Sequence, residues 1–247
     1  TEIYTLSLHD ALPICVRGSS AFLFEPRDAY RFNPRTVPAQ GNYDQSAGTN
    51  PANAAYLNYW ISEENAGSPV TLTITDATGA LVRSLEVSSE PGMNRAFWDF
   101  QGESSTAIRR RVAPLFAPWV DYGPDRVRVQ NGMSLRHPPG AYTVTLDVAG
   151  EEFTQQLTVL KDPSSEGTIA DIRAQFAAME EIRNDYDAAA DAINRIEWIR
   201  RQLYDLVDVL EDQGGAEELI TGADALDNAF IEVEEELIQL RSTGTGQ

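Results

Sequence analysis

The residues that could carry chemistry in this sequence are few, and they lack partners at useful spacings. His137 is followed by Pro138 and Pro139, which indicates a loop, and the other histidine, His9, lies near the start of the chain. A zinc site or a Ser-His-Asp triad needs several ligands or partners in defined positions. We therefore expect His137 to be a solvated loop residue, and we predict no metal ligand and no cofactor.

Acidic residues are abundant, so paired carboxylates of the glycosidase type need separate consideration. The sequence offers Asp99 with Glu103, and Glu63 with Glu64. A glycosidase holds its two carboxyl groups roughly 5 to 10 Å apart on either side of a sugar. Neighbouring acids in an acidic chain do not indicate such an arrangement, so we predict no catalytic residue and expect that this chain is not itself an enzyme.

The composition excludes some partners. The chain has 247 residues, 42% of them apolar, which is enough for a folded core. Its formal charge of −19 would repel the phosphates of nucleic acids and anionic membranes, and no run of 18 apolar residues is present to span a bilayer. Lys161 is the single lysine, a bias that either salt-rich surroundings or a GC-rich gene would produce.

The first residues differ in character from the rest. Residues 1–15, TEIYTLSLHDALPIC, resemble a translated sequencing adapter, which removes His9 and the single cysteine, Cys15, from consideration. A genuine N-terminal strand and turn is the alternative. Residues 16–55 are rich in Pro, Gly, Asn and Ser and have little periodicity, so we expect them to form an extended connector.

Residues 56–162 show the alternation of strands. In PVTLTITD and GAYTVTLDV apolar residues alternate with threonines, and turn signals separate these runs, which predicts a two-sheet antiparallel sandwich. In NRAFWDF the alternation puts Trp98 and Asp99 on opposite faces, so we interpret Trp98 as a core ring. The predicted core residues are Trp98, Val70, Leu72, Ile74, Tyr142, Val144 and Leu146.

A loop at residues 101–140 is long for a compact domain, and loops of this length often bind or pack. Trp119 and Tyr122 are the candidate binding residues, because exposed rings can stack on a sugar or on a partner. The alternative, which we favour, is a lid that folds over the sandwich edge and inserts Leu115, Phe116 and Trp119.

Residues 163–247 change to helical periodicity, which makes the chain an α+β multidomain protein. Apolar residues at steps of three and four predict one helix over about 168–212, ended by Gly214 and Gly215, and a second over about 216–241. The second helix carries a seam at strict four-three spacing, so we expect the two helices to pack through it as an antiparallel hairpin. The seam residues are Leu219, Ala223, Leu226, Phe230, Val233, Leu237 and Leu240.

Two stretches carry a family resemblance. Residues 69–100 and 138–163 resemble the immunoglobulin-like domain of flagellar hook-capping proteins. They are more similar still to the C-terminal region of large secreted bacterial proteins, sortilin-like or glycosyl hydrolase-like, whose main body is a β-propeller of neuraminidase repeats. The stretch AFLFEPRDAYRFNP looks like the exit from the last propeller blade.

The resemblance implies a non-catalytic accessory region, consisting of an immunoglobulin-like sandwich (56–162) followed by a helical hairpin (163–247). It implies that the chain is cut at both ends, that the parent protein is extracellular or periplasmic, and that the parent has a propeller that carries any glycosyl hydrolase activity. The expected partner is that propeller or another protein, bound through the helical seam. A carbohydrate-binding module serving a glycoside hydrolase is the alternative function.

Overall fold

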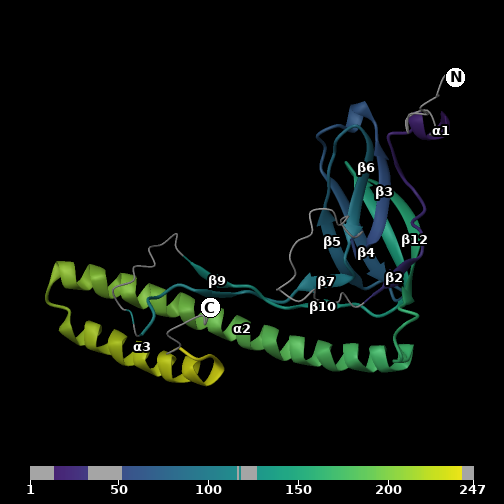
Figure 1. Cartoon of the computed structure of the whole chain (residues 1–247). Coiled ribbons are helices and arrows are strands. Elements are labelled where there is room, and N and C mark those ends of the chain that lie inside the picture. The colour runs from purple at the N-terminus through teal and green to yellow at the C-terminus, as the bar shows by residue number, and fades with distance from the viewer. Residues whose placement is uncertain (1–13, 33–51, 116, 118–126, 241–247) are drawn as a thin grey trace, which may run out of the picture. The chain divides into compact units, whose positions relative to one another are not determined.

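The computed structural model describes residues 14–32, 52–115, 117 and 127–240 (Figure 1). The chain forms two compact units. The first consists of Thr1–Glu103 with Ser134–Ala178, and the second of Ser104–Met133 with Met179–Gln247. The segment at 104–133, which we expected to belong to the sandwich, is thus grouped with the helices.

The first unit contains two main sheets. The larger has the order β2-β12-β11-β4-β5, and the smaller has the order β1-β3-β6. Every pairing in them is antiparallel except that of β12 with β2. The strands are β1 (Ala21–Leu23), β2 (Ala29–Arg31), β3 (Ala55–Ile61), β4 (Val70–Asp76), β5 (Leu81–Glu86), β6 (Gly92–Trp98), β11 (Gly140–Val148) and β12 (Glu151–Lys161).

Two strands lie in the segment that we expected to be a connector. β1 pairs with β3, and β2 pairs with β12. The expectation of an extended connector at residues 16–55 is therefore wrong for these two stretches, because three residues are enough to add an edge strand to an existing sheet. A short helix, α1 (Ile14–Arg17), precedes β1, and residues 1–13 lie outside the described part of the chain.

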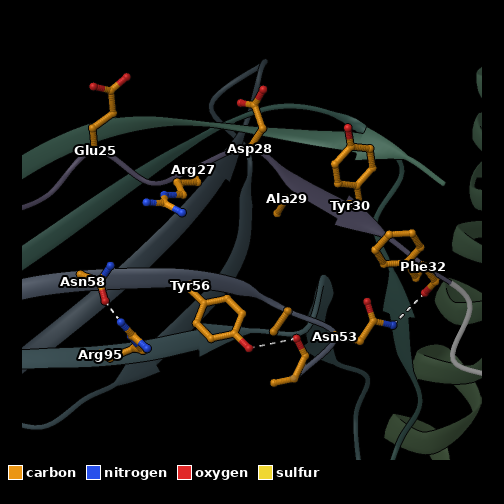
Figure 2. Close-up of a pocket in the computed structure, with 12 residues that line it drawn as sticks. Glu25, Arg27, Asp28, Ala29, Tyr30, Phe32, Asn53, Tyr56, Asn58 and Arg95 are labelled. Carbon is orange, nitrogen blue, oxygen red and sulfur yellow. Dashed lines mark hydrogen bonds between the residues drawn. The ribbon is translucent and has the colours of Figure 1, made fainter. Parts of the chain in front are cut away.

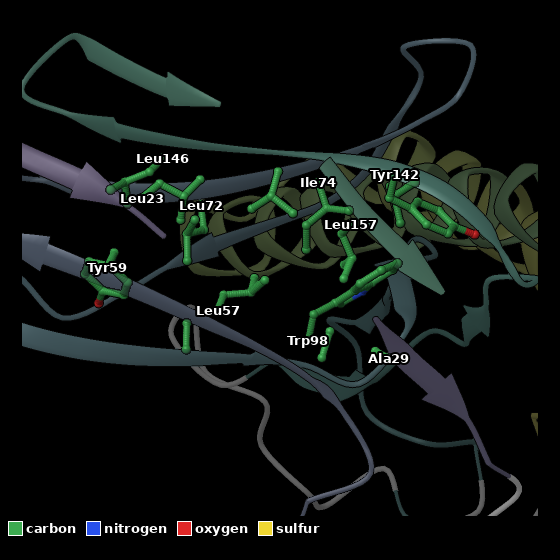
Figure 3. Packing of buried hydrophobic residues seen from close by; sticks show 14 of the residues in the cluster. Leu23, Ala29, Leu57, Tyr59, Leu72, Ile74, Trp98, Tyr142, Leu146 and Leu157 are labelled. Carbon is green, nitrogen blue, oxygen red and sulfur yellow. The ribbon is translucent and has the colours of Figure 1, made fainter. Parts of the chain in front are cut away.

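The two sheets share one hydrophobic core (Figure 3), and all seven predicted core residues lie in it. The period-two pattern explains this: Val144 pairs with Ile74 and Leu146 with Leu72, so that alternate residues of neighbouring strands point to the same face. Burial of such side chains contributes roughly 1.5 to 3 kcal/mol each. The first unit thus consists of two largely antiparallel sheets that are held together by this core.

Trp98 is the largest side chain of the core and is 1% exposed. Its ring meets Phe100 and Tyr142 edge-on at centroid distances of 5.5 and 5.0 Å, and its Nε1 donates a hydrogen bond to the Gln101 carbonyl at 2.9 Å. Asp99 is exposed, as the alternation predicts. Phe100 is also buried, but with a φ of 67°, so the strand ends at Trp98 instead of continuing regularly.

The helices are α2 (Ile169–Gln213) and α3 (Glu217–Leu237). α2 begins with a capping arrangement, in which Thr168 Oγ1 accepts a hydrogen bond from the Asp171 backbone N–H and Asp171 accepts one from that of Thr168. Gly214 and Gly215 end it with positive φ angles of 69° and 80°. Residues of α2 up to Ala178 belong to the first unit and the remainder to the second.

Between β6 and β11 the chain forms short strands. β7 (Gln101–Ser104) pairs with β10 (Ser134–Arg136), and β8 (Ile108–Arg110) pairs with β9 (Arg128–Gln130). A 3-10 turn, η2 (Glu63–Asn65), follows β3. The long loop therefore has strands of its own, which explains how so many residues fit between β6 and β11.

Candidate functional site

An open cleft of about 530 Å³ lies in the first unit (Figure 2). It is bounded by β2 and the segment that leads into it, by β3 and the residues before it, and by one residue of β6. Charged, amide and aromatic side chains from separate strands converge there, as they do in ligand-binding clefts. The lining residues are Glu25, Arg27, Asp28, Ala29, Tyr30, Phe32, Ala52, Asn53, Ala54, Tyr56, Asn58 and Arg95.

Aromatic rings form one part of this cleft. Tyr30 and Phe32 are alternate residues, so they lie on the same side of the strand, and their rings stack at 5.6 Å with 44% of each residue exposed. The Tyr56 ring meets the edge of Phe97 at 5.0 Å and has the Arg95 guanidinium over it at 5.5 Å. Such rings offer contact area that loses little conformational entropy on binding.

Amide side chains supply hydrogen-bonding groups beside the rings. Asn58 Oδ1 accepts a hydrogen bond from Arg95 Nε at 2.8 Å. Asn53 Nδ2 donates to the Phe32 carbonyl at 2.8 Å, whereas Asn53 Oδ1 is buried and has no hydrogen-bond partner among the described residues. A buried acceptor without a donor costs free energy, and a ligand hydroxyl group would satisfy it.

The charges around the cleft balance. Glu25 and Asp28 carry negative charge, and Arg27 and Arg95 carry positive charge. In a chain with a formal charge of −19 this is a locally neutral surface. The cleft therefore suits an uncharged, hydroxyl-rich ligand better than a strongly charged one.

Sequence reasoning missed these residues. The predicted binding residues, Trp119 and Tyr122, lie outside the described part of the chain. The alternation of Tyr30 and Phe32 within DAYRF was the available signal, but we treated that stretch as part of a connector. Which strands bring Tyr56 and Arg95 beside it is decided only by the fold.

The other chemistry-bearing residues have structural partners. His137 is half-buried instead of solvated, because its ring packs 4.7 Å from that of Phe176 and its backbone N–H donates to the Phe100 carbonyl. Asp99 Oδ1 accepts a hydrogen bond from the Gln101 backbone N–H, and Glu103 accepts one from the backbone of β5. Among the described residues, no group of three or more His, Cys, Asp and Glu side chains is arranged to hold a metal ion.

In the second unit, α2 side chains hold the backbone around β8. Asp187 Oδ1 accepts from the Thr106 N–H at 2.5 Å, and Asn194 accepts from the Arg109 N–H at 2.7 Å and donates to the Ala107 carbonyl at 2.9 Å. These contacts satisfy several polar backbone groups of the described part of this segment. Phe116 and Trp119, two of the three residues expected to insert as a lid, lie outside the described residues, so the lid stays a prediction.

A buried charge cluster joins α2 to α3. Arg200 is 1% exposed; its Nε lies 2.8 Å from Asp227 Oδ1 and its Nη1 lies 2.9 Å from Glu234 Oε2. Tyr204 donates a hydrogen bond to Asp227 at 3.1 Å. Burial acts to lower the pKa of Arg200, but the hydrogen bond and the charge of Asp227, with the charge of Glu234, raise it overall, so the guanidinium stays charged.

A second buried carboxyl group belongs to this cluster. Glu197 Oε2 accepts hydrogen bonds from the backbone N–H groups of Arg111 and Val112. Burial, and then the neighbouring Glu197 charge, raise the pKa of Glu234 to about 7. Glu234 Oε1 has no partner atom within the described residues when the group is ionised, and a proton on this carboxyl group would reduce both the desolvation cost and the repulsion.

Only part of the seam expected between the helices is buried. Ala223 and Leu240 are buried, but the side of α3 that meets α2 carries Asp227 and Glu234. The prediction that the helices pack through the whole seam is therefore wrong for four of its seven residues, which are exposed, whereas Ala223 and Leu240 are buried. The exposed seam residues are Leu219 (65%), Leu226 (46%), Val233 (52%) and Leu237 (42%), which we call the α3 stripe.

Comparison with protein-family models, with curated proteins and with solved structures gives no match for this chain. Within the described residues, neither long helix has an apolar stretch sufficient to cross a membrane.

Proposed function

We propose that this chain is a non-catalytic accessory and interaction region from the C-terminal part of an exported β-propeller protein, sortilin-like or glycosyl hydrolase-like. In this proposal the first unit is an immunoglobulin-like β-sandwich, and α2 and α3 form an antiparallel helical hairpin. The parent protein would be extracellular or periplasmic. The proposal rests on the sequence resemblance and on one observation in the structure, the α3 stripe.

The α3 stripe has the pattern of a helix-packing surface. Leu219, Leu226 and Val233 follow one another at intervals of seven, and Leu237 adds a step of four, which is the spacing of a coiled-coil seam. Apolar groups at this spacing lose their contact with water when a second helix or an apolar groove covers them. Each Å² of apolar surface that is removed from water in this way contributes roughly 25 cal/mol to the free energy of binding.

The charge around the stripe restricts the partner. Residues 217–237 contain no Lys or Arg but several acids, beginning with Glu217 and Glu218. A second copy of the same helix would bring acids against acids, which is unfavourable. We therefore propose a partner surface with an apolar centre and a basic rim, carried by the parent propeller or by another exported protein.

Replacing Leu226 and Val233 together by Ser is expected to weaken binding to the separately produced upstream propeller by at least about tenfold, since two apolar anchors are lost. Isothermal titration calorimetry measures this, and Leu81→Ser, which alters an exposed leucine on β5 (59% exposed), is the matched control. Equal affinity of the double variant and the wild type, or no binding by either, would contradict the proposal.

A second candidate function, carbohydrate binding, is favoured by the cleft of Figure 2. Its ring faces can stack on the C–H faces of a sugar, while Asn53, Asn58 and the charged side chains can bind hydroxyl groups. The balanced charge favours a neutral oligosaccharide. An open cleft can hold part of a long glycan chain without enclosing its ends.

Glycan-array binding by the full chain, lost on Tyr30→Ala with Tyr56→Ala but retained in Trp198→Ala, is the expected result for this second function. Trp198 is an exposed ring on α2 outside the cleft (52% exposed), which makes it a matched control. Loss of binding only in Trp119→Ala with Tyr122→Ala would place the sugar at the residues predicted from sequence. If the full chain binds no glycan, carbohydrate binding as its function is contradicted.

A further inference from the structure

Three basic side chains converge on a second cleft of the first unit. This cleft has a volume of about 440 Å³, and Arg31 of β2, Arg136 of β10 and Lys161 of β12 line it. The chain as a whole has twice as many acids as bases, 38 against 19. A local gathering of positive charge in such a chain calls for a physical explanation.

Two of the three cations are held next to each other by the sheet itself. Arg31 and Lys161 are direct partners in the parallel pairing of β2 with β12. Like charges at directly paired positions are destabilising. Arg136 joins them from another strand, and its guanidinium donates to the Phe32 carbonyl at 2.6 Å while Arg31 donates to the Arg136 carbonyl at 3.4 Å.

No carboxylate forms an ion pair with these three side chains within the described residues, although the charge of the exposed Asp99 acts on Arg136. The ion pairs found there involve other arginines, namely Arg83, Arg183, Arg200 and Arg201. Lys161 Nζ donates to the backbone carbonyls of Asp162 and Ser165 instead. Half-buried cations without an ion-pair partner are costly. Burial lowers the pKa of both Arg31 and Arg136, and the neighbouring Arg31 charge lowers that of Arg136 further, while the Asp99 charge offsets part of this effect on Arg136.

The two acids that line the cleft are engaged elsewhere. Asp162 Oδ1 accepts a hydrogen bond from the Ser164 N–H at 2.8 Å. Asp171 Oδ2 accepts from the Thr168 N–H at 2.9 Å and from its hydroxyl group at 2.7 Å, so it caps α2. Neither acid lies within ion-pair distance of the three cations.

Some N–H groups of Arg31 and Arg136 are not used by these hydrogen bonds and can bind a ligand. A guanidinium group has five N–H donors, and the hydrogen bonds above use one nitrogen of each arginine. Arg31 Nε is buried and has no hydrogen-bond partner among the described residues. Arginine binds planar or tetrahedral oxyanions through two parallel N–H groups, and lysine adds a point charge.

We propose that this cleft binds an oxyanion group, a phosphate, sulfate or carboxylate, carried by a small organic molecule such as an acidic sugar. The anion would lie between Arg31 and Arg136 with Lys161 beside it. The volume of the cleft exceeds that of an inorganic ion, so there is space for the molecule that carries the charge. This inference is independent of the α3 stripe and of the first cleft.

The test is a titration of the full chain with inorganic phosphate, glucose 6-phosphate, glucuronate and uncharged glucose, followed by calorimetry and by the NMR signals of the arginine Nε–H groups. We expect the three anions to bind and glucose not to bind. Arg31→Gln and Arg136→Gln should each weaken binding about tenfold or more. Arg83→Gln, which alters an arginine that pairs with Glu103 at 3.7 Å on the same unit, should leave it unchanged.

Because Arg31, Arg136 and Lys161 all donate hydrogen bonds to backbone carbonyls, Lys161→Gln serves as a third variant that should also weaken anion binding, and circular dichroism checks that each variant is folded. Tighter binding of glucose 6-phosphate than of glucuronate would identify a phosphate or sulfate ester as the source of the charge, and the reverse order would identify a carboxylate. Binding of glucose as strong as that of the anions, no binding of any anion, or an equal loss in Arg83→Gln would overturn the proposal.

Discussion

Replacing Arg200 by Met is expected to destabilise the packing of α3 on α2 by about 3 to 5 kcal/mol, because the change leaves buried carboxylates without their cation. Asp227 and Glu234 both lie within 2.9 Å of the Arg200 guanidinium, and Glu234 is 0% exposed. Urea unfolding followed by far-UV circular dichroism measures the loss, and hydrogen exchange of α3 shows where it occurs.

Arg201→Met is the matched control for this experiment. Arg201 is the next residue and pairs with Asp205 at 2.7 Å on the exposed side of α2, where an ion pair contributes less than about 1 kcal/mol. The double variant Arg200→Met with Glu234→Met should recover part of the loss, since an apolar pair replaces Arg200 and Glu234 while Asp227 still lacks its cation. Equal effects of Arg200→Met and Arg201→Met would show that the cluster does not hold the helices together.

The stability of the second unit is expected to fall as pH rises through neutrality, by roughly 2 to 3 kcal/mol. The pKa of Glu234 is raised from 4.5 to about 7 in the folded chain, so the folded state binds this proton more tightly than the unfolded state. The stabilisation from the proton is complete below about pH 4.5 and is lost as the pH rises through about 7. Arg200, Glu197, Asp227 and Tyr204 are the charged and titratable groups nearest to it.

Glu234→Gln isolates this effect, because glutamine has no charge at any pH and can still donate a hydrogen bond. The variant should match the wild type near pH 4, where the Glu234 proton is bound in both states, and exceed its stability at pH 8.5, as measured by urea unfolding at each pH. Glu236→Gln, at an exposed position two residues further on, should keep the wild-type pH dependence. A Glu234→Gln protein with that same dependence would show that Glu234 does not titrate in this range.

The strands of the first unit were predictable from sequence because their signal is local. Alternating apolar residues and threonines in β4 and β11 define one face each, and one face has to be buried whatever the partner strand is. Trp98 was assigned to the core for the same reason. The strands β1 and β2 were missed because three residues are too few for a period to be recognised.

The helices show both the strength and the limit of a periodic pattern. Their bounds were predicted to within a few residues, since Gly214 and Gly215 interrupt the pattern. Which face of α3 is buried was predicted only in part, because Ala223 of the seam is buried but Leu219, Leu226 and Val233 are exposed. The apolar seam is the expected contact by hydrophobicity, but Arg200 lies on the opposite helix and pairs with Asp227 and Glu234, and no local pattern in α3 reveals that partner.

The sequence by itself determined where the longer strands and the two long helices occur, seven residues of the first unit's core, and that the chain is strongly acidic, because these properties depend on composition and on neighbours along the chain. The tertiary structure alone decided which side chains meet. Tyr30 and Tyr56 share a cleft, and Arg31, Arg136 and Lys161 share another, although more than a hundred residues separate Arg31 from Arg136. Binding sites of this kind depend on strand order and on helix rotation, which are set by the packing of the whole unit.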